Sequence, residues 1–367
     1  MVRSTRSADK LGAKGGNGAL DGAPAGEPPF TAVLHNKSTG LAHYQPGQRL
    51  DPDRVPYPRT NTPLEEAAAI ATMLLVFGSA WLAPFVLLAA LASLAFGSRL
   101  GAAVLAIIVA AAALPPGQRQ HWFLHHWVWD TWRRYFRYRG VVPAAPLSTD
   151  LNKHLIFVHV PHAVFPMGSW LSFPLCGEPE THVPAPMNGL VATVLLQLPY
   201  IKHMFGWMGC YSADKPVMLK LLKTQSVGVI VEGVAGIFHG ATQQQERVFI
   251  MQRKGFVKVA IQAGADLVPA YHFGSSQMLS VTGTPELSRR LRTSLCFFWG
   301  RASLPLPRKH DILSAVGPTV AVTQCDEPTQ AQIDETHARF VEVMQATFEQ
   351  HKHILGPAWV AKKLLVV

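Results

Sequence analysis

Charged residues are scarce in this sequence, and they are scarcest in one stretch. Only 15% of the 367 residues are charged, whereas a soluble domain usually carries about 25%. Residues 67–116 hold a single charge, at Arg99. An apolar stretch of this length argues against an ordinary soluble chain and predicts contact with a membrane. The alternative is a core helix buried inside a soluble protein.

The cysteines also lack the regular spacing of a metal site or a redox motif. The four cysteines are Cys176, Cys210, Cys296 and Cys325, and their separations fit neither a metal site nor a redox motif. We interpret them as reduced core residues of a protein that faces a cytosolic compartment.

No motif typical of RNA or DNA binding is present, although the formal net charge is +10. A basic surface beside a membrane segment suits anionic lipid or a polyanionic cofactor. The partners predicted from composition are therefore membrane lipids, and not nucleic acid.

The first 63 residues are rich in Gly, Pro, Ala and Ser and show no hydrophobic period. Such a segment cannot bury enough apolar area to fold, so residues 1–63 are predicted to be a disordered cytosolic tail. Arg3 and Arg6 suggest a transit peptide, but Asp9 and a run of glycines disfavour an amphipathic presequence.

Residues 64–116 are predicted to form a membrane-embedded helical hairpin. Ala67–Ser98 is 32 residues without a charge, which exceeds the about 20 residues that span a bilayer core. The run Leu100–Leu114 is shorter, so it is either a re-entrant arm or the return half of the hairpin. A cleaved signal peptide is disfavoured, because the run begins too late and is too long.

Residues 117–149 combine aromatic and basic side chains. Trp residues mixed with Arg133, Arg134, Arg137 and Arg139 favour the headgroup layer on the cytoplasmic side of a membrane. An amphipathic helix that covers a globular domain is the alternative, and the two interpretations are compatible.

From residue 150 the pattern changes, and residues 150–355 are predicted to be one α/β domain, followed by a C-terminal tail at 356–367. Strands that alternate with helices predict a mostly parallel sheet with flanking helices. The expected strands are Leu155–Val160, Val227–Val231 and Leu267–Phe273, and the expected helices are 216–223, 247–263 and one that opens at the Thr329–Gln332 capping box.

One polar residue follows the first of these strands directly. The apolar run Leu155–Val158 predicts a buried strand, Pro161 interrupts its ladder, and His162 comes next. Strand ends in α/β folds face the crevice where ligands bind. His162 is therefore either a group that exchanges a proton near neutral pH or a packed loop residue.

Three more blocks accompany this stretch, LIFVHVPHAVFPMGSW. Together they resemble the type-2 diacylglycerol acyltransferase family, which includes monoacylglycerol and wax-alcohol acyltransferases. The resemblance extends from about residue 65 to 355, and FWGR at 298–301 and EPTQAQID at 327–334 are similar to the later blocks of the family. The three blocks are PYIKHMFGWMG at 199–209, VGVIVEGVAGIFHG at 227–240 and RKGFVKVAIQAGADLVPAYHFG at 253–274.

The resemblance points to His162 as the catalytic residue. The signature of the family is His-Pro-His-Gly or Glu-Pro-His-Ser, and this sequence has Val160, Pro161, His162 and Ala163 at the four positions. The glycine turn of the family usually carries a glutamate, and the matching position here is Gly236. The nearby acid Glu232 is either a substitute partner of His162 or a polar residue at the end of a strand.

The resemblance implies transfer of an acyl group from acyl-CoA to the free hydroxyl of diacylglycerol, giving triacylglycerol. His162 would act as the general base and Glu232 would orient it. Backbone N–H groups near Gly233 and Gly236 would stabilise the oxyanion. Acyl-CoA is a co-substrate, and no permanently bound cofactor or metal is expected. The residues expected to meet the phosphates of coenzyme A are Arg253, Lys254 and Lys258, with a solvated helix face as the alternative.

The family also implies a place and some alternatives. The expected location is the endoplasmic reticulum membrane with the catalytic domain in the cytosol, extending to the lipid-droplet surface, and self-association is left open. The acceptor is alternatively monoacylglycerol or a fatty alcohol. The departures at Val160 and Gly236 alternatively indicate a weak relative that acts as a lipid-binding scaffold. A hydrolase is disfavoured, because Ser169 lacks the Gly-x-Ser-x-Gly context of a nucleophile.

Overall fold

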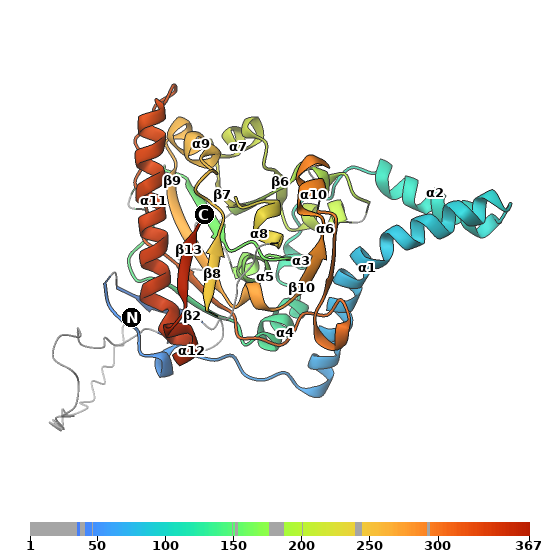
Figure 1. Cartoon of the computed structure of the whole chain (residues 1–367), viewed down its shortest axis with the longest axis horizontal. Helices are drawn as coiled ribbons and strands as arrows, with labels where there is room; N and C mark the ends of the chain where they lie inside the picture. The colour runs from blue at the N-terminus through green and yellow to red at the C-terminus, as the bar shows by residue number, and fades with distance from the viewer. Residues whose placement is uncertain are drawn as a thin grey trace, which may run out of the picture.

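A nine-stranded sheet runs through the body of the protein (Figure 1). The computed structural model describes residues 35–36, 41–45, 47–148, 150, 153–175, 187–199, 201–238, 244–291 and 294–367. Only the two pairs β1–β2 and β12–β9 are antiparallel, so the sheet is mostly parallel, as predicted. In spatial order the strands are His35–Asn36 (β1), Leu41–Tyr44 (β2), Arg139–Pro143 (β3), Leu313–Val316 (β12), Asp266–Phe273 (β9), Leu155–Val160 (β4), Ser226–Ile230 (β7), Met187–Val191 (β5) and Cys210–Ser212 (β6).

Helices cover both faces of this sheet, which gives the α/β architecture that was expected. One face carries Lys215–Leu221 (α7), Gly255–Ala263 (α9) and the long helix Gln330–His351 (α11). The other face carries His121–Leu124 (α3), Trp127–Tyr135 (α4), Met167–Ser172 (α5), Ile201–Trp207 (α6) and the first half of a helix at Pro63–Ala95 (α1).

The central strand β4 separates two hydrophobic clusters. Its residues alternate between them: Ile156 and Val158 belong to the cluster under α9 and α11, while Leu155 and Phe157 belong to the cluster under α5. A strand buried on both faces needs a continuous apolar run, and this is why the sequence located β4 correctly. The Thr329–Gln332 capping box likewise opens α11, as predicted.

The predicted helix 247–263 is correct only in its second half. The first part is a strand, Gln245–Val248 (β8), which pairs in parallel with Lys363–Val366 (β13). α9 begins only at Gly255. The short helix Pro357–Val360 (α12) precedes β13, so residues 356–367 are folded against the body (Figure 1). The acyltransferase domain therefore does not end at residue 355.

Two further helices and a separate two-stranded sheet follow β7 and β9 in the chain. A short helix, Val234–Phe238 (α8), follows β7. Farther along the chain, Ser280–Gly283 (β10) and Cys296–Trp299 (β11) form an antiparallel pair. The helix Pro285–Leu291 (α10) connects them and packs against α8.

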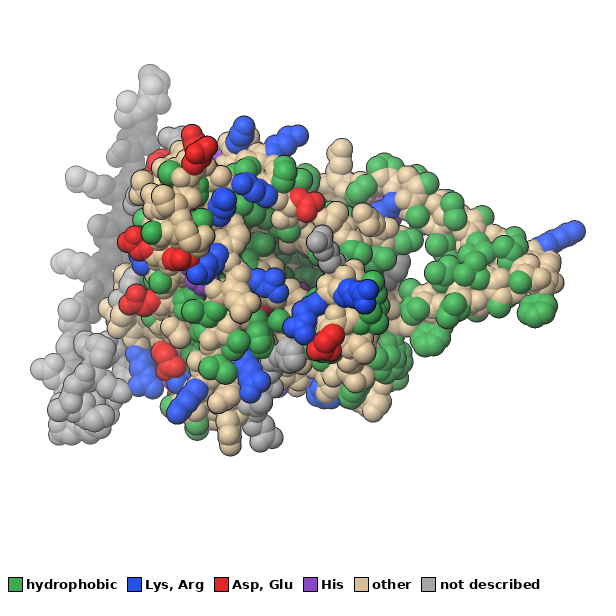
Figure 2. All heavy atoms as spheres, turned by 45° about the horizontal axis from the view of Figure 1, so that its top comes forward, with side chains coloured by type: hydrophobic (Ala, Val, Ile, Leu, Met, Phe, Trp, Pro, Cys, Tyr) green, Lys and Arg blue, Asp and Glu red, His purple; other side chains and the backbone are tan. Residues whose placement is uncertain are grey.

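A helical hairpin projects from the body. α1 and Arg99–Ala113 (α2) pack against each other and extend away from the sheet (Figure 1). Figure 2 shows hydrophobic side chains along both arms. Within the described residues, α1 is the one helix that is long and apolar enough to cross a membrane, and only 17% of its most apolar window is buried. Most of this window is therefore exposed, unlike that of a helix buried in a protein core.

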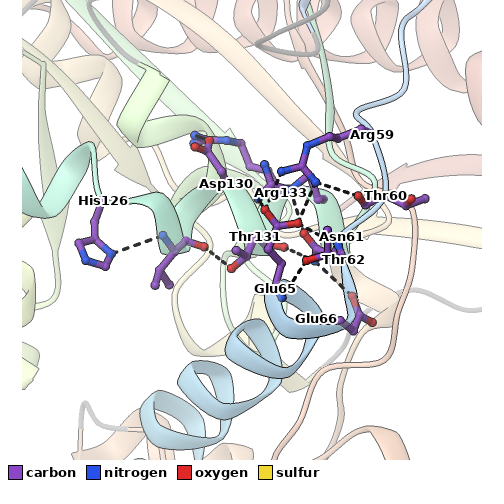
Figure 3. A network of polar contacts seen from close by, with 12 residues as sticks. Arg59, Thr60, Asn61, Thr62, Glu65, Glu66, His126, Asp130, Thr131 and Arg133 are labelled. Carbon is purple, nitrogen blue, oxygen red and sulfur yellow. Dashed lines mark hydrogen bonds and ion pairs between the residues drawn. The ribbon is translucent and has the colours of Figure 1, made fainter.

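Polar contacts attach the hairpin to the body at the start of α1 (Figure 3). Thr62 and Glu65 form a capping box that satisfies the first turn. The Glu65 carboxylate also pairs with Arg59 at 2.6 Å and with Arg134 of α4 at 2.9 Å. The first turn of α1 is thereby held against α4.

The other end of the hairpin is attached as well. Lys202 Nζ on α6 donates to the carbonyl oxygen of Ala112 at 2.5 Å, and His203 Nε2 lies 3.3 Å from that of Ala111. These contacts satisfy carbonyl groups in the last turn of α2, which have no partner inside the helix. Both ends of the hairpin are therefore fixed to the body.

Two predicted segments are more folded than expected. The disordered tail at 1–63 is wrong for its second part, because Leu41–Tyr44 forms β2 and Leu41 is 3% exposed. Residues 117–149 are not simply interfacial either: Arg139 lies in β3 and is 1% exposed. Both segments contain strands of the main sheet, so the domain begins well before residue 150. Residues 1–34 lie outside the described residues.

Candidate active site

His162 and Glu232 lie at the same edge of the sheet. β4 and β7 are adjacent and parallel, with His159 opposite Ile230. His162 and Glu232 both come shortly after their strands end. Because the carboxyl ends of parallel strands meet at one edge, the two residues are brought together.

The His162 imidazole is held by the residue that follows it. Its Nδ1 lies 2.7 Å from the carbonyl oxygen of Ala163. A carbonyl oxygen can only accept, so Nδ1 carries the proton and Nε2 keeps its lone pair. Burial lowers the pKa of His162 below 6.5, although two backbone contacts oppose the shift. The half-buried ring is therefore neutral at pH 7, and Nε2 can accept a proton.

Ala163 has an unusual backbone conformation. Its φ angle is 54°, in the left-handed region that costs a residue with a Cβ about 1–2 kcal/mol. Glycine adopts this region without that cost, which accounts for the glycine at this position in the signature described above. The strained conformation directs the Ala163 carbonyl to Nδ1 of His162, so it fixes the ring.

Glu232 contacts the backbone of His162, which differs from the expected contact with the imidazole. Its Oε2 accepts a hydrogen bond from the His162 N–H, and its Oε1 accepts one of 2.9 Å from the Phe249 N–H. The side chain is 0% exposed. Burial raises the pKa of Glu232 to about 7, against the lowering effect of the two N–H donors. Glu232 thus joins the ends of β4, β7 and β8.

The two glycines of the turn lie directly beside this pair. Gly233 has a φ of 60° and makes the turn that follows Glu232. A Cβ added at Gly236, in α8, would lie 2.8 Å from the Cβ of His162 and 2.9 Å from that of Glu232. The space that a side chain at 236 would need is occupied by these two residues. A glutamate at 236 would therefore compete for space with the glutamate that is present at 232.

The three basic residues expected to meet phosphates are dispersed. Lys254 pairs with Asp334 of α11 at 2.7 Å, and Lys258 is exposed on α9. Arg253 comes near the turn, since its guanidinium would lie 3.9 Å from a Cβ at Gly233. None of the three lines the cavity beside His162.

A cavity of about 1260 Å³ begins at the residue after His162. Ala163 and Val164 form one wall, Ile237 and Phe238 of α8 another, and Trp359 of α12 a third. Figure 2 shows a hollow in the body with several Lys and Arg side chains around it. The basic residues of the lining are Arg247, Arg308, Lys309, His310 and Lys362.

Two other histidines form a buried pair. Nδ1 of His159 lies 2.8 Å from Nε2 of His272, and their rings are stacked with centroids 5.1 Å apart. Burial lowers the pKa of His159 to about 4 and also lowers that of His272. They are 7% and 2% exposed, so the pair is part of the protein interior.

Comparison with known proteins assigns the chain to a family. Residues 100–363 match the model of the diacylglycerol acyltransferase family, which is most of the chain. The protein belongs to the diacylglycerol acyltransferase family. The predicted resemblance is confirmed, and so is the prediction of an acyl-CoA-dependent O-acyltransferase.

Relatives in the family act on different acceptors, as their names state. The chain is 30% identical over 265 residues to diacylglycerol O-acyltransferase 2-like protein 6 of Bos taurus, covering 64% of this chain and 76% of that one. It is 27% identical to acyl-CoA wax alcohol acyltransferase 1 of Homo sapiens, with 65% and 78% covered. It is also 27% identical to diacylglycerol O-acyltransferase 2 of Bos taurus, with 65% and 72% covered.

One solved structure is similar at a low level. The 1-acyl-sn-glycerophosphate acyltransferase PlsC of Thermotoga maritima aligns with a TM-score of 0.36 and 12% identity, over 76% of this chain and 95% of that one. This likeness is too distant to support the assignment to the diacylglycerol acyltransferase family, which rests on the sequence matches.

In this member of the diacylglycerol acyltransferase family, the sequence did not reveal one buried ion pair near the site. Lys362, beside β13, donates to Glu246 of β8 at 2.6 Å, and the side chains are 5% and 1% exposed. Ser276 donates to the same carboxylate at 2.9 Å. The positions are 116 residues apart, so only the pairing of β8 with β13 could have indicated the contact.

Proposed function

We propose that this protein transfers the acyl group of acyl-CoA to the free hydroxyl of diacylglycerol, giving triacylglycerol. The observation that carries the proposal is the hydrogen bond from His162 Nδ1 to the Ala163 carbonyl at 2.7 Å. It leaves Nε2 unprotonated at the carboxyl edge of the sheet, beside the large cavity. The family assignment supplies the reaction class.

His162 would take the proton of the acceptor hydroxyl. The hydroxyl oxygen attacks the thioester carbonyl as Nε2 accepts its proton, because an alcohol is a poor nucleophile until it loses that proton. A C–O bond forms and a tetrahedral intermediate collapses as the C–S bond breaks. The imidazolium then returns the proton to the departing thiolate of coenzyme A.

Two neighbouring groups would assist this base. Glu232 acts as a positioning residue, because it holds the backbone N–H of His162. The turn from Gly233 to Gly236 approaches the Cβ of His162, so its backbone N–H groups are candidates for stabilising the oxyanion. These roles follow from contacts with His162 and not from contacts with a substrate.

The hairpin would anchor the enzyme in a membrane. α1 is long and apolar enough to cross a bilayer, and most of its apolar surface is free of protein contacts. We propose that residues 64–116 are embedded in the endoplasmic reticulum membrane, with the body in the cytosol and access to lipid droplets. A lipid acceptor would then reach the site from the membrane.

The acceptor is the least constrained part of the proposal. A relative named as a wax alcohol acyltransferase matches about as well as the diacylglycerol acyltransferases do. Monoacylglycerol and fatty alcohols are therefore the alternative acceptors of the same reaction. An inactive lipid-binding scaffold is the remaining alternative, motivated by the residues at 160 and 236.

The experiment compares neutral lipids in cells that lack their own triacylglycerol synthesis. Cells that express the wild-type protein should accumulate triacylglycerol, and cells that express His162→Ala should not. Loss of a general base typically lowers the rate by about 10²–10⁴-fold, so microsomes should show the same difference with labelled acyl-CoA. Supplying monoacylglycerol or a fatty alcohol in place of diacylglycerol identifies the acceptor.

His310→Ala is the matched control. His310 also lines the cavity, and its Nδ1 likewise lies near the carbonyl of the next residue, at 3.0 Å. The Glu232 carboxylate bonds the backbone of His162 and Phe249 and not that of His310, so we expect activity within a few-fold of wild type. If His162→Ala remained active and His310→Ala did not, the assigned base would be wrong. If the wild-type protein made no acyl ester with any of the three acceptors, the lipid-binding scaffold would be favoured.

A further inference from the structure

The cavity beside His162 contains more positive charge than the protein neutralises. Four cationic side chains line it together with one carboxylate, Asp311, which pairs with Arg137 outside the lining at 3.5 Å. Lys309 pairs with Glu66 at 2.9 Å, and Lys362 pairs with Glu246. Among the described residues, no carboxylate lies within ion-pair distance of the other two, Arg247 and Arg308.

Arg247 is the more unusual of the two. It projects from β8, and its Nε is buried without a hydrogen-bond partner among the described residues. Buried polar groups in proteins are nearly always paired, because an unpaired donor loses its hydration without compensation. Arg247 also lines the cavity, and no described carboxylate compensates its charge, so this part of the lining suits an anion.

Arg308 approaches from a separate segment. It lies in the loop before β12, and the only described hydrogen-bond partner of its guanidinium is the neutral hydroxyl of Ser280, at 2.9 Å. The polar residues Ser276 and Gln277 line the same cavity. Planar guanidinium groups match phosphate oxygens in a two-point geometry, which a carboxylate-paired lysine cannot offer.

We propose that Arg247 and Arg308 bind the phosphate groups of the nucleotide end of acyl-CoA. This inference rests on the proposed acyl-CoA-dependent function, and it replaces Arg253, Lys254 and Lys258 as the phosphate ligands. The same cavity extends to Ala163, next to the base. One extended co-substrate can therefore have its phosphates at the arginines and its thioester at His162.

The size of the cavity fits this occupant. Pockets for small ligands usually measure about 300–1,000 Å³, and this one is larger, at about 1260 Å³. Its lining includes polar residues, such as Gln244 and Gln277, and apolar residues, such as Ile237 and Leu279. A ligand with a charged nucleotide at one end and an acyl thioester at the other needs both kinds of surface.

The test measures binding of 3′,5′-ADP, the phosphate-bearing fragment, to the purified full-length protein by equilibrium dialysis. Arg247→Gln and Arg308→Gln should each weaken binding by about 10- to 100-fold, the usual effect of losing a charged hydrogen bond. Arg308→Lys keeps the charge and loses the two-point geometry, so it should be intermediate. The KM for acyl-CoA should rise in parallel while kcat stays within a few-fold.

Arg290→Gln is the charge-matched control. Arg290 is exposed on α10 and does not line the cavity, so its variant should bind 3′,5′-ADP as the wild type does. Thermal unfolding of each variant checks the fold. Unchanged binding in both Arg247→Gln and Arg308→Gln would overturn the proposal, above all if Arg253→Gln weakened it.

Lipid headgroups also carry phosphate, and a second arm separates the two sources. Vesicles of phosphatidylcholine with or without phosphatidic acid are sedimented with each variant. If the arginine variants lost only the preference for phosphatidic acid and still bound 3′,5′-ADP, the site would be a headgroup site and the proposal wrong. Because the binding arm needs no turnover, it stands apart from the proposed function: arginine-dependent 3′,5′-ADP binding without acyl transfer would refute only the latter.

Discussion

The Glu232 carboxylate accepts a hydrogen bond from the backbone N–H of His162. Its second oxygen accepts the Phe249 N–H at 2.9 Å. The acid therefore fixes the main chain from which the imidazole projects, and the Ala163 carbonyl fixes the ring. In the triad arrangement one carboxylate orients the ring directly. Here that task is divided between a buried carboxylate and a strained peptide.

Glu232→Gln should lower kcat by about 10- to 100-fold. The amide directs an NH₂ group at one of two backbone N–H donors, so one hydrogen bond worth about 1–3 kcal/mol is lost and His162 shifts. Steady-state kinetics measure the effect. Glu342→Gln, on the exposed face of α11, is the matched control and should be silent. Full activity in Glu232→Gln would remove the positioning role.

The buried Glu232 should also make stability depend on pH. Its folded-state pKa is about 7, above the usual 4.5, so the folded protein holds this proton more tightly than the unfolded chain does. The protonated Glu232 therefore adds about 3 kcal/mol to the free energy of unfolding below pH 4.5, and this stabilisation is lost as the pH rises through 7. Denaturant unfolding gives the free energy of unfolding of wild type and Glu232→Gln at each pH, and the two values should approach each other at low pH. A constant difference between the two proteins across the range would contradict the prediction.

The activity should fall at acid pH because of His162. Its pKa lies below 6.5, so the base is unprotonated at neutral pH and becomes protonated only in more acidic solution. We expect kcat/KM to rise with pH to a plateau, with the midpoint below 6.5. The same profile is recorded for Glu232→Gln. An inflection near pH 7 that is present in the wild type and absent in this variant is due to the titration of Glu232. A midpoint above 6.5 in both proteins would contradict the prediction.

Restoring the family glutamate with Gly236→Glu should impair the enzyme. A Cβ at this position would lie 2.8 Å from the Cβ of His162, closer than van der Waals contact permits, so α8 or His162 must move. We expect at least a tenfold loss of kcat. Gly236→Ala is the smaller test and should show a weaker loss of the same kind. The double variant Glu232→Gly/Gly236→Glu lacks the competing side chain at 232, so it should recover part of the activity that Gly236→Glu loses. Equal activity in Gly236→Glu and the double variant would be evidence that the side chains at 232 and 236 do not compete for one space.

Lys362→Met should destabilise the fold strongly. The change leaves Glu246, which is 1% exposed, without its ion-pair partner, and breaking a buried pair costs about 3–5 kcal/mol. Denaturant unfolding measures the loss. In the double variant Glu246→Gln/Lys362→Met no charge remains buried, so most of the stability should return. Equal losses in both variants would show that the pair contributes only through packing.

The sequence predicted those parts of the fold that have local causes. The run from Leu155 to Val158 forms a buried strand in any context, and the Thr329–Gln332 box satisfies its own helix. β8 has no such local cause, because its partner β13 lies more than 100 residues later. β2 is likewise a short strand that exists because β3 is beside it.

The candidate site divides in the same way. His162 could be identified because a polar residue after a buried strand faces the ligand crevice. The contact of Glu232 could not, since its partners are the N–H groups of His162 and Phe249, and every residue except proline has such a group. Arg247 was assigned to the predicted helix 247–263, and its position in the lining of the cavity follows only from its place on β8.

The pairing of β8 with β13 sets an order on the synthesis of the chain. The hairpin leaves the ribosome early, and the strands that carry His162 and Glu232 follow it, because domains form from the N-terminus onward. β8 then presents an open edge until residues 363–366 are made, and an unpaired strand edge attracts other chains. The wall of the cavity formed by Trp359 and Lys362 arrives in the same final step. The hairpin is thus made before the body is complete, and the wall of the cavity that contains Trp359 and Lys362 is added last.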